Sequence, residues 1–179
     1  MATKPPSAAL TVRRLAPADA ERYRALRLAG LAAFPHAFRS TVEEAQAQPL
    51  SWAEKRLSET SNYWFGAFDG AELVGAICLR TQEGIKNRHS ASLNALVVDP
   101  ARQRRGTGAA LVAHLIDFAR SLGTIRQITL TVTDGNTSAE GLYERFGFRQ
   151  FGFEPDAFLQ DGKYYAKQHR QLLLASPQS

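Results

Sequence analysis

The chain has 179 residues, of which 44% are hydrophobic and 22% charged, and its formal net charge at pH 7 is +5. This length suits one domain with a single core, and no apolar run approaches the roughly 18 residues that a membrane-spanning helix needs. The excess of basic residues indicates an anionic partner. The single cysteine, Cys78, excludes an internal disulfide, and its apolar neighbours predict a buried thiol.

The domain is expected to span residues 10–174, with flexible ends at 1–9 and 175–179. Residues 1–9 contain no apolar stretch that could serve as a secretory signal. We therefore expect a cytoplasmic protein.

Apolar periodicity and turn signals divide the chain into alternating strands and helices. Asp69–Gly70 marks a hairpin, and Thr41 and Ser51 begin capping boxes with an acid three residues on. In chain order, we expect a strand (10–15), a helix (17–34), one or two short helices (41–59), strands (62–68, 73–81, 90–98), a helix (106–122), a strand (127–132), a helix (136–146) and two strands (148–153, 163–173). This order predicts an α/β or α+β fold with a mixed sheet.

The strongest chemical signal is the segment Gln103-Arg104-Arg105-Gly106-Thr107-Gly108, between a predicted strand and an amphipathic helix. A helix start offers backbone N–H groups without internal partners, and glycine lets them approach phosphate oxygens closely. The segment lacks the Gly-Lys-Ser/Thr ending of a nucleotide-hydrolysing loop, and it does not follow the first strand as a dinucleotide loop would. The alternative is a plain helix start with a basic surface.

In these motifs the sequence resembles the GNAT superfamily of N-acetyltransferases. Residues 96–100 (Leu-Val-Val-Asp-Pro) lead into the 103–108 loop in the manner of that family. A second block is formed by Asn136, Ala139, Leu142-Tyr143 and Gly147-Phe148. The resemblance covers nearly the whole chain.

The resemblance implies a mixed, splayed central sheet flanked by helices, with acetyl-CoA as cosubstrate between strands 90–98 and 127–132. The pantetheine arm would pair with the backbone of strand 90–98, and the pyrophosphate would lie on the amides of residues 104–109. The cofactor-binding residues expected on this basis are Leu96, Val97, Val98, Gln103, Arg104, Arg105, Gly106, Thr107, Gly108, Ala109, Asn136, Ala139 and Tyr143.

The implied reaction is direct transfer, in which a neutral amine attacks the thioester and no metal is required. A backbone N–H near Val97 would hold the developing oxyanion, and Tyr143 would protonate the departing thiolate. The alternative for Tyr143 is a core residue with its hydroxyl at the edge.

The general base is the open part of this scheme. Many relatives carry a glutamate on the central strand, but residues 92–94 contain no acid. His89 is the first candidate because a neutral imidazole accepts a proton near pH 7; the alternative is a strand-entry histidine whose backbone is hydrogen-bonded. Glu44 and Asp156 are further candidates.

The acceptor side of the cleft should be walled by residues 34–59, including 35–38, and by a loop at 154–163. We expect acetylation of a primary amine on a small molecule or peptide; the alternative is a noncatalytic acyl-CoA-binding or regulatory module. Nucleic-acid binding is not expected, because the chain lacks a dense basic and aromatic stripe. Edge strands of an open sheet would allow a homodimer.

Overall fold

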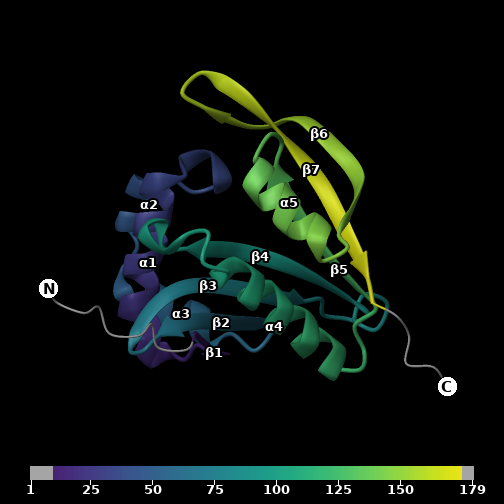
Figure 1. The fold of residues 1–179 in the computed structure, drawn as a ribbon, viewed down its shortest axis with the longest axis horizontal. Coiled ribbons are helices and arrows are strands. Elements are labelled where there is room, and N and C mark those ends of the chain that lie inside the picture. Colours follow the sequence, from purple (N-terminus) through teal and green to yellow (C-terminus); the bar gives the residue numbers. More distant parts are fainter. Residues whose placement is uncertain (1–9, 175–179) are drawn as a thin grey trace, which may run out of the picture.

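The computed structural model describes residues 10–174, so the two ends expected to be flexible, 1–9 and 175–179, lie outside the described residues. The described part forms one seven-stranded sheet in the order β1-β2-β3-β4-β5-β7-β6 (Figure 1). Its main elements are β1 (Thr11–Arg14), α1 (Ala20–Ala33), α2 (Val42–Gln46), α3 (Leu50–Ser58), β2 (Asn62–Asp69), β3 (Glu72–Thr81), β4 (Ser90–Val98), α4 (Thr107–Ser121), β5 (Gln127–Thr133), α5 (Thr137–Arg145), β6 (Arg149–Gln160) and β7 (Lys163–Leu173). Among the strands of residues 10–174, only β4 and β5 pair in parallel, which confirms the predicted mixed sheet.

Helices cover both faces of the sheet, because successive side chains of a strand point to opposite sides. Ile77 of β3 belongs to one buried cluster with Leu111 of α4, whereas Cys78 belongs to a second cluster with Tyr23 of α1. The thiol of Cys78 is buried as expected, and burial raises its pKa to about 12. Among the helices of residues 10–174, none is long and apolar enough to cross a membrane.

The sheet opens in its middle. β4 and β5 pair only from Ser90 to Ser92, opposite Gln127 to Thr129, and then diverge. Near the divergence β4 bulges: its register with β3 shifts, and Ala95 has a φ of 53°. From Leu93 onward, the edge of β4 that faces β5 pairs with no strand of the described residues. This is the splayed sheet that the family resemblance implied (Figure 1).

One expectation about the last strands is wrong. The segment 154–163 is not a loop, because β6 continues to Gln160 and turns into β7 at Asp161–Gly162. Pro155 lies within this strand. Proline is tolerated here because β6 is an edge strand and the ladder is interrupted between Glu154 and Phe158, so no pairing N–H is required.

Candidate active site

A cavity of about 500 Å³ fills the opening between the two halves of the sheet. It is lined by the loop before α4, the last residues of β4 and one face of α5. The expected cofactor-binding residues that line it are Leu96, Val97, Val98, Gln103, Arg104, Gly106, Thr107, Gly108, Ala109, Asn136 and Ala139. The structure therefore brings eleven of the thirteen together. Arg105 is exposed and outside the cavity, and Tyr143 lines a neighbouring one.

The loop before α4 presents unpaired backbone donors to this cavity. Gly106 is the N-cap, with a φ of 84°, a value that favours glycine, and the first helical hydrogen bond runs from the Ala110 N–H to the Gly106 carbonyl at 2.9 Å. Within residues 10–174, the N–H groups of 104–109 have no acceptor. A row of unpaired N–H groups at the start of a 15-residue helix suits a pyrophosphate.

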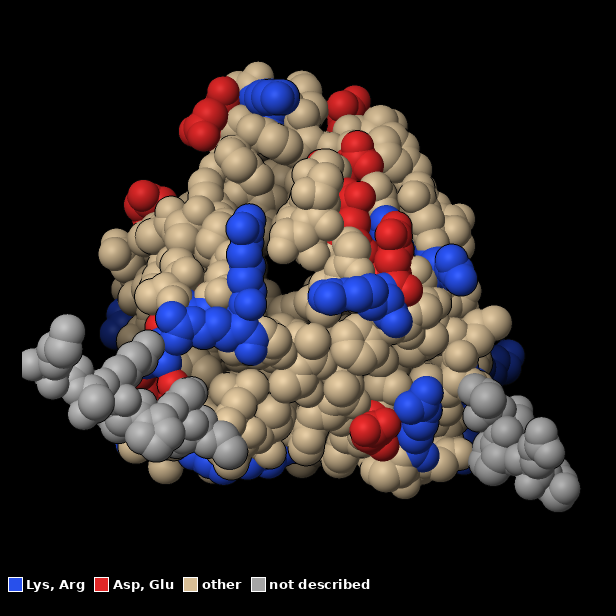
Figure 2. All heavy atoms as spheres, in the orientation of Figure 1, with Lys and Arg blue, Asp and Glu red and all other residues tan. Residues whose placement is uncertain are grey.

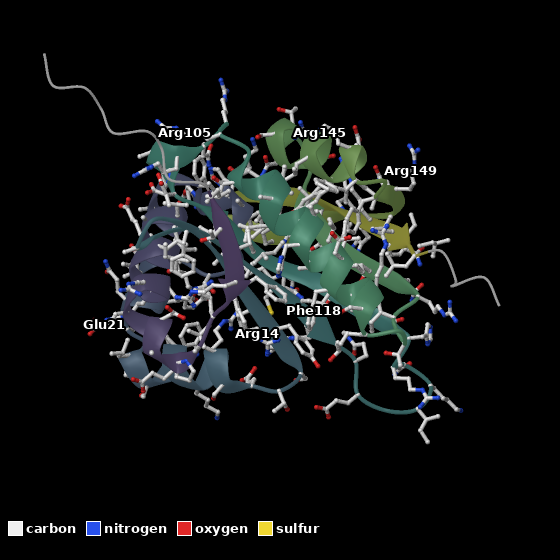
Figure 3. The ribbon with its side chains drawn as sticks, turned by 60° about the horizontal axis from the view of Figure 1, so that its bottom comes forward. Arg14, Glu21, Arg105, Phe118, Arg145 and Arg149 are labelled. Atoms are coloured by element: carbon white, nitrogen blue, oxygen red, sulfur yellow. The ribbon has the colours of Figure 1, made fainter. Side chains whose placement is uncertain are left out.

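Basic side chains surround the mouth of the cavity. Figure 2 shows them on both sides of a hollow in the middle of the molecule. In Figure 3, Arg105 of the loop and Arg145 of α5 come to the same edge of the fold. Arg145 lines the cavity together with Arg104. Nothing in the sequence singles out Arg145, because a basic residue in the last turn of a helix is ordinary.

The end of β4 is fixed by its neighbours on one side and open on the other. Val97 and Val98 pair with Ala76 and Gly75 of β3. Gly30 of α1 packs so closely that a Cβ there would lie 2.4 Å from Val97 Cγ2. The opposite edge of β4 remains available, so an extended amide-containing chain can pair with it as an added strand would.

A second cavity, of about 300 Å³, adjoins the first, and Asn136 and Ala139 line both. Asn136 caps α5 by accepting the Ala139 N–H at 3.3 Å. Tyr143 follows one turn later and lines the second cavity. Its ring is buried against Phe148, with 5.8 Å between centroids, and burial raises its pKa. Its hydroxyl makes no hydrogen bond within the described residues.

Residues 35–38 close the opening from the α1 side. Ala37 and Phe38 line both cavities, in agreement with the expected wall. Residues 35–38 are linked to β5 across the opening of the sheet, because Thr133 of β5 donates its hydroxyl to the His36 carbonyl at 2.7 Å. The His36 ring also stacks on Tyr165 of β7, 4.6 Å between centroids.

None of the three candidate bases lines either cavity. His89 is exposed, and eight residues at about 3.3 Å each place it roughly 25 Å along β4 from Val97. Its carbonyl accepts the N–H of Arg126 at 2.7 Å, which is the strand-entry arrangement. Glu44 accepts the Thr41 N–H in its capping box at 2.9 Å, and Asp156 is exposed on β6.

The second cavity is instead lined by four basic residues that no sequence motif indicates: Arg27, Arg39, Arg56 and Lys167. They come from α1, the connection after it, α3 and β7, so no local pattern joins them. Within residues 10–174, no group of three or more His, Cys, Asp or Glu side chains could hold a metal ion.

Comparison with known proteins gives a consistent picture. The acetyltransferase (GNAT) family matches residues 28–148. The chain is 34% identical over 104 residues to N-alpha-acetyltransferase RimI of Mycobacterium tuberculosis, covering 58% of this chain and 63% of that protein. It is 42% identical over 107 residues to the [ribosomal protein bS18]-alanine N-acetyltransferase of Escherichia coli, covering 60% and 70%.

Coverage of the relatives is partial. A third relative, the uncharacterized protein ML0378 of Mycobacterium leprae, is 31% identical over 114 residues, which are 64% of this chain but only 30% of that protein. The chain thus spans less than two thirds of the length of this protein and of RimI. Among solved structures, yncA of Salmonella typhimurium with its cofactor acetyl-CoA superposes with a TM-score of 0.78 at 19% identity, covering 96% and 98% of the two chains. That likeness concerns the fold.

Proposed function

This chain belongs to the GNAT family of acetyltransferases, and from that premise we propose that it transfers an acetyl group from acetyl-CoA to a primary amine. The observation that carries the proposal is the pair of adjoining cavities in the split sheet. The first combines unpaired N–H groups at residues 104–109 with the open edge of β4. The second holds Tyr143 at the same junction.

Each part of the cosubstrate has a matching surface. Acetyl-CoA would supply the acetyl group as an activated thioester. The N–H groups of residues 104–109 would bind its pyrophosphate, with Arg104 and Arg145 adding charge. The open backbone of Leu96 and Val98 would bind the amides of its pantetheine arm, and a backbone N–H near Val97 would stabilise the oxyanion.

Tyr143 is the proposed acid for the thiolate. Burial favours its neutral form, so the hydroxyl keeps its proton throughout the physiological range. No carboxylate or imidazole lines either cavity within the described residues. We therefore propose that the amine loses its proton to solvent before attack, and that no side chain acts as a dedicated base.

The first test is the thermal midpoint with and without excess acetyl-CoA. At about 100 times the dissociation constant, binding adds about 2.7 kcal/mol, or roughly 5–10 °C for a domain of this size. Gly106→Val should abolish the shift. Gly84→Val is the matched control, since Gly84 also has a positive φ, 94°, and equally open surroundings. No shift with folded wild-type protein would refute the cofactor assignment.

Turnover with a panel of amines then separates an enzyme from a noncatalytic acyl-CoA-binding module. An enzyme releases CoA in proportion to acetylated amine. A noncatalytic module shows the acetyl-CoA-dependent thermal shift without turnover of any amine.

We further propose that residues 10–174 act as one cytoplasmic domain without nucleic-acid binding. The edge strand β6, with Phe151 and Phe153 more than half exposed, would pair two copies into a homodimer. Sedimentation should give the dimer mass, and Phe151→Lys should give the monomer mass.

The absence of nucleic-acid binding is tested with DNA. No DNA binding at low salt would support this proposal, whereas salt-sensitive DNA binding would contradict it. Fractionation of cells tests the location.

A further inference from the structure

We propose that the amine acceptor carries a carboxylate beside its amino group, as a free amino acid does, and that the basic side chains of the second cavity bind it. This inference rests on the acetyl transfer proposed above and specifies its acceptor. The four side chains concerned are Arg27, Arg39, Arg56 and Lys167, called the basic cluster below.

Among residues 10–174, no acidic side chain forms an ion pair with the basic cluster. Within the described residues, the second cavity is lined by no Asp or Glu, and no member of the cluster has a carboxylate oxygen within 4.0 Å. A surface cation needs no partner, because water solvates it. Several cations around a cavity of about 300 Å³ repel one another and lower the free energy of any anion that enters.

Lys167 is the most buried member of the cluster, with 5% of its surface exposed. Its ammonium lies 5.2 Å from the centre of the Phe158 ring. Burial and the neighbouring Arg39 lower its pKa, and the acid that opposes them, Glu154, is 3.2 Å from His169. An entering carboxylate would be the missing partner of this ammonium.

Two arginines of the cluster are already held in position. Arg27 donates from Nη2 to Ser40 Oγ at 3.1 Å, while its buried Nε has no hydrogen-bond partner within the described residues. Arg56 donates from Nε to the Tyr23 hydroxyl at 3.2 Å, and its guanidinium lies 4.7 Å from the Trp64 ring centre. Its two Nη groups carry no hydrogen bond within residues 10–174. Fixed guanidinium donors suit a planar carboxylate.

The cosubstrate's own phosphates do not account for this charge. The N–H row and Arg104 line the first cavity only, at the loop end. The basic cluster lines the second cavity, together with Tyr143 and Ala95, where the acetyl group and the acceptor would meet. The charge therefore acts on the acceptor, and it disfavours polyamines and other cationic amines by like-charge repulsion.

The first experiment compares acids with their neutral amides and uses the proposed products, which contain no titrating amine. In the presence of CoA, a set of N-acetyl amino acids and the matching N-acetyl amino acid amides are titrated against the full chain by calorimetry. We expect at least one acid to bind about tenfold or more tightly than its amide, the size of a charge-assisted hydrogen bond. Equal binding, tighter binding of amides, or no binding of any acid would overturn the inference.

The second experiment measures the same preference for acids over amides in variants of the chain. Lys167→Met should reduce the preference for acids over amides to less than about threefold, and Lys167→Arg should restore it. Lys86→Met removes the same charge from an exposed loop outside both cavities and should change nothing. Should Lys167→Met not fold, Arg27→Met serves in its place.

The two proposals fail in different ways. If acetyl-CoA does not raise the thermal midpoint, the proposed acetyl transfer itself is refuted. If acetyl-CoA raises the thermal midpoint and the protein acetylates neutral or cationic amines but not amino acids, only the carboxylate assignment is refuted.

Discussion

Replacing Tyr143 by phenylalanine removes one oxygen atom and tests whether that atom is the acid of the reaction. The ring stays 94% buried against Phe148, because only 6% of the residue is exposed. The hydroxyl makes no hydrogen bond within the described residues, so its loss should change the free energy of unfolding by less than about 1 kcal/mol. A general acid contributes about 10²–10⁴ in rate, or about 2.7–5.4 kcal/mol of transition-state stabilisation. We therefore expect kcat to fall by that factor.

The assay is thiol release from acetyl-CoA with an accepted amine, followed from pH 6.5 to 9.5. Because burial raises the pKa of Tyr143 above its ordinary value, the wild-type rate should not decline towards pH 9.5 through loss of this proton. The acetyl-CoA dissociation constant should stay within about threefold. Tyr63→Phe is the control, because the Tyr63 ring packs against Phe118 in a tilted arrangement and lines neither cavity. A kcat for Tyr143→Phe within threefold of wild type would refute the acid role.

Three further outcomes can be checked on stability and reactivity. Gly106→Ala should cost about 1 kcal/mol in unfolding free energy through its positive φ, as Gly84→Ala should, but only the former should weaken acetyl-CoA binding. Cys78, with its pKa raised to about 12, should react with a thiol reagent at pH 8 at least a hundredfold more slowly in native than in denatured protein. Asp19, which accepts from Arg13 at 2.8 Å, has a lowered pKa, so its stabilisation is present above the unfolded pKa near 3.9 and is lost as the pH falls through the lower folded value. Asp19→Asn should lower stability at pH 7 by about 1–3 kcal/mol and flatten its dependence on pH below 4, which urea unfolding at each pH measures.

Local sequence was enough for the elements whose signals are local. The 103–108 loop was predicted because glycine and the start of a helix are adjacent in the chain, and the structure places five of its six residues in the first cavity. The hairpin at Asp69–Gly70 and the helix α2 followed from turn and capping residues. The capping box expected at Ser51 is wrong, because α3 begins at Leu50 after Pro49 and Ser51 lies inside the helix. These signals act within a few residues, so they need no knowledge of the fold.

The predictions that were wrong or missing concern features that depend on tertiary structure and not on local sequence. The length of β6 depends on its place at the sheet edge, where Pro155 costs no ladder hydrogen bond. His89 was chosen for its chemistry and its proximity to β4 in sequence, but β4 carries it to the end away from the opening. Each residue of an extended strand adds about 3.3 Å, so a side chain several positions away along the strand lies outside the active site.

Sequence by itself determined the family, the mixed sheet and the phosphate-type loop, because each depends on contiguous motifs. Only the tertiary structure decided how the acceptor side is charged. Arg27, Arg56 and Lys167 are separated by 29 and 111 positions in the chain, and none belongs to a motif. They line one cavity because α1 and α3 pack together on one side of the opening while β7 lies on the other, beyond the point where β4 and β5 separate.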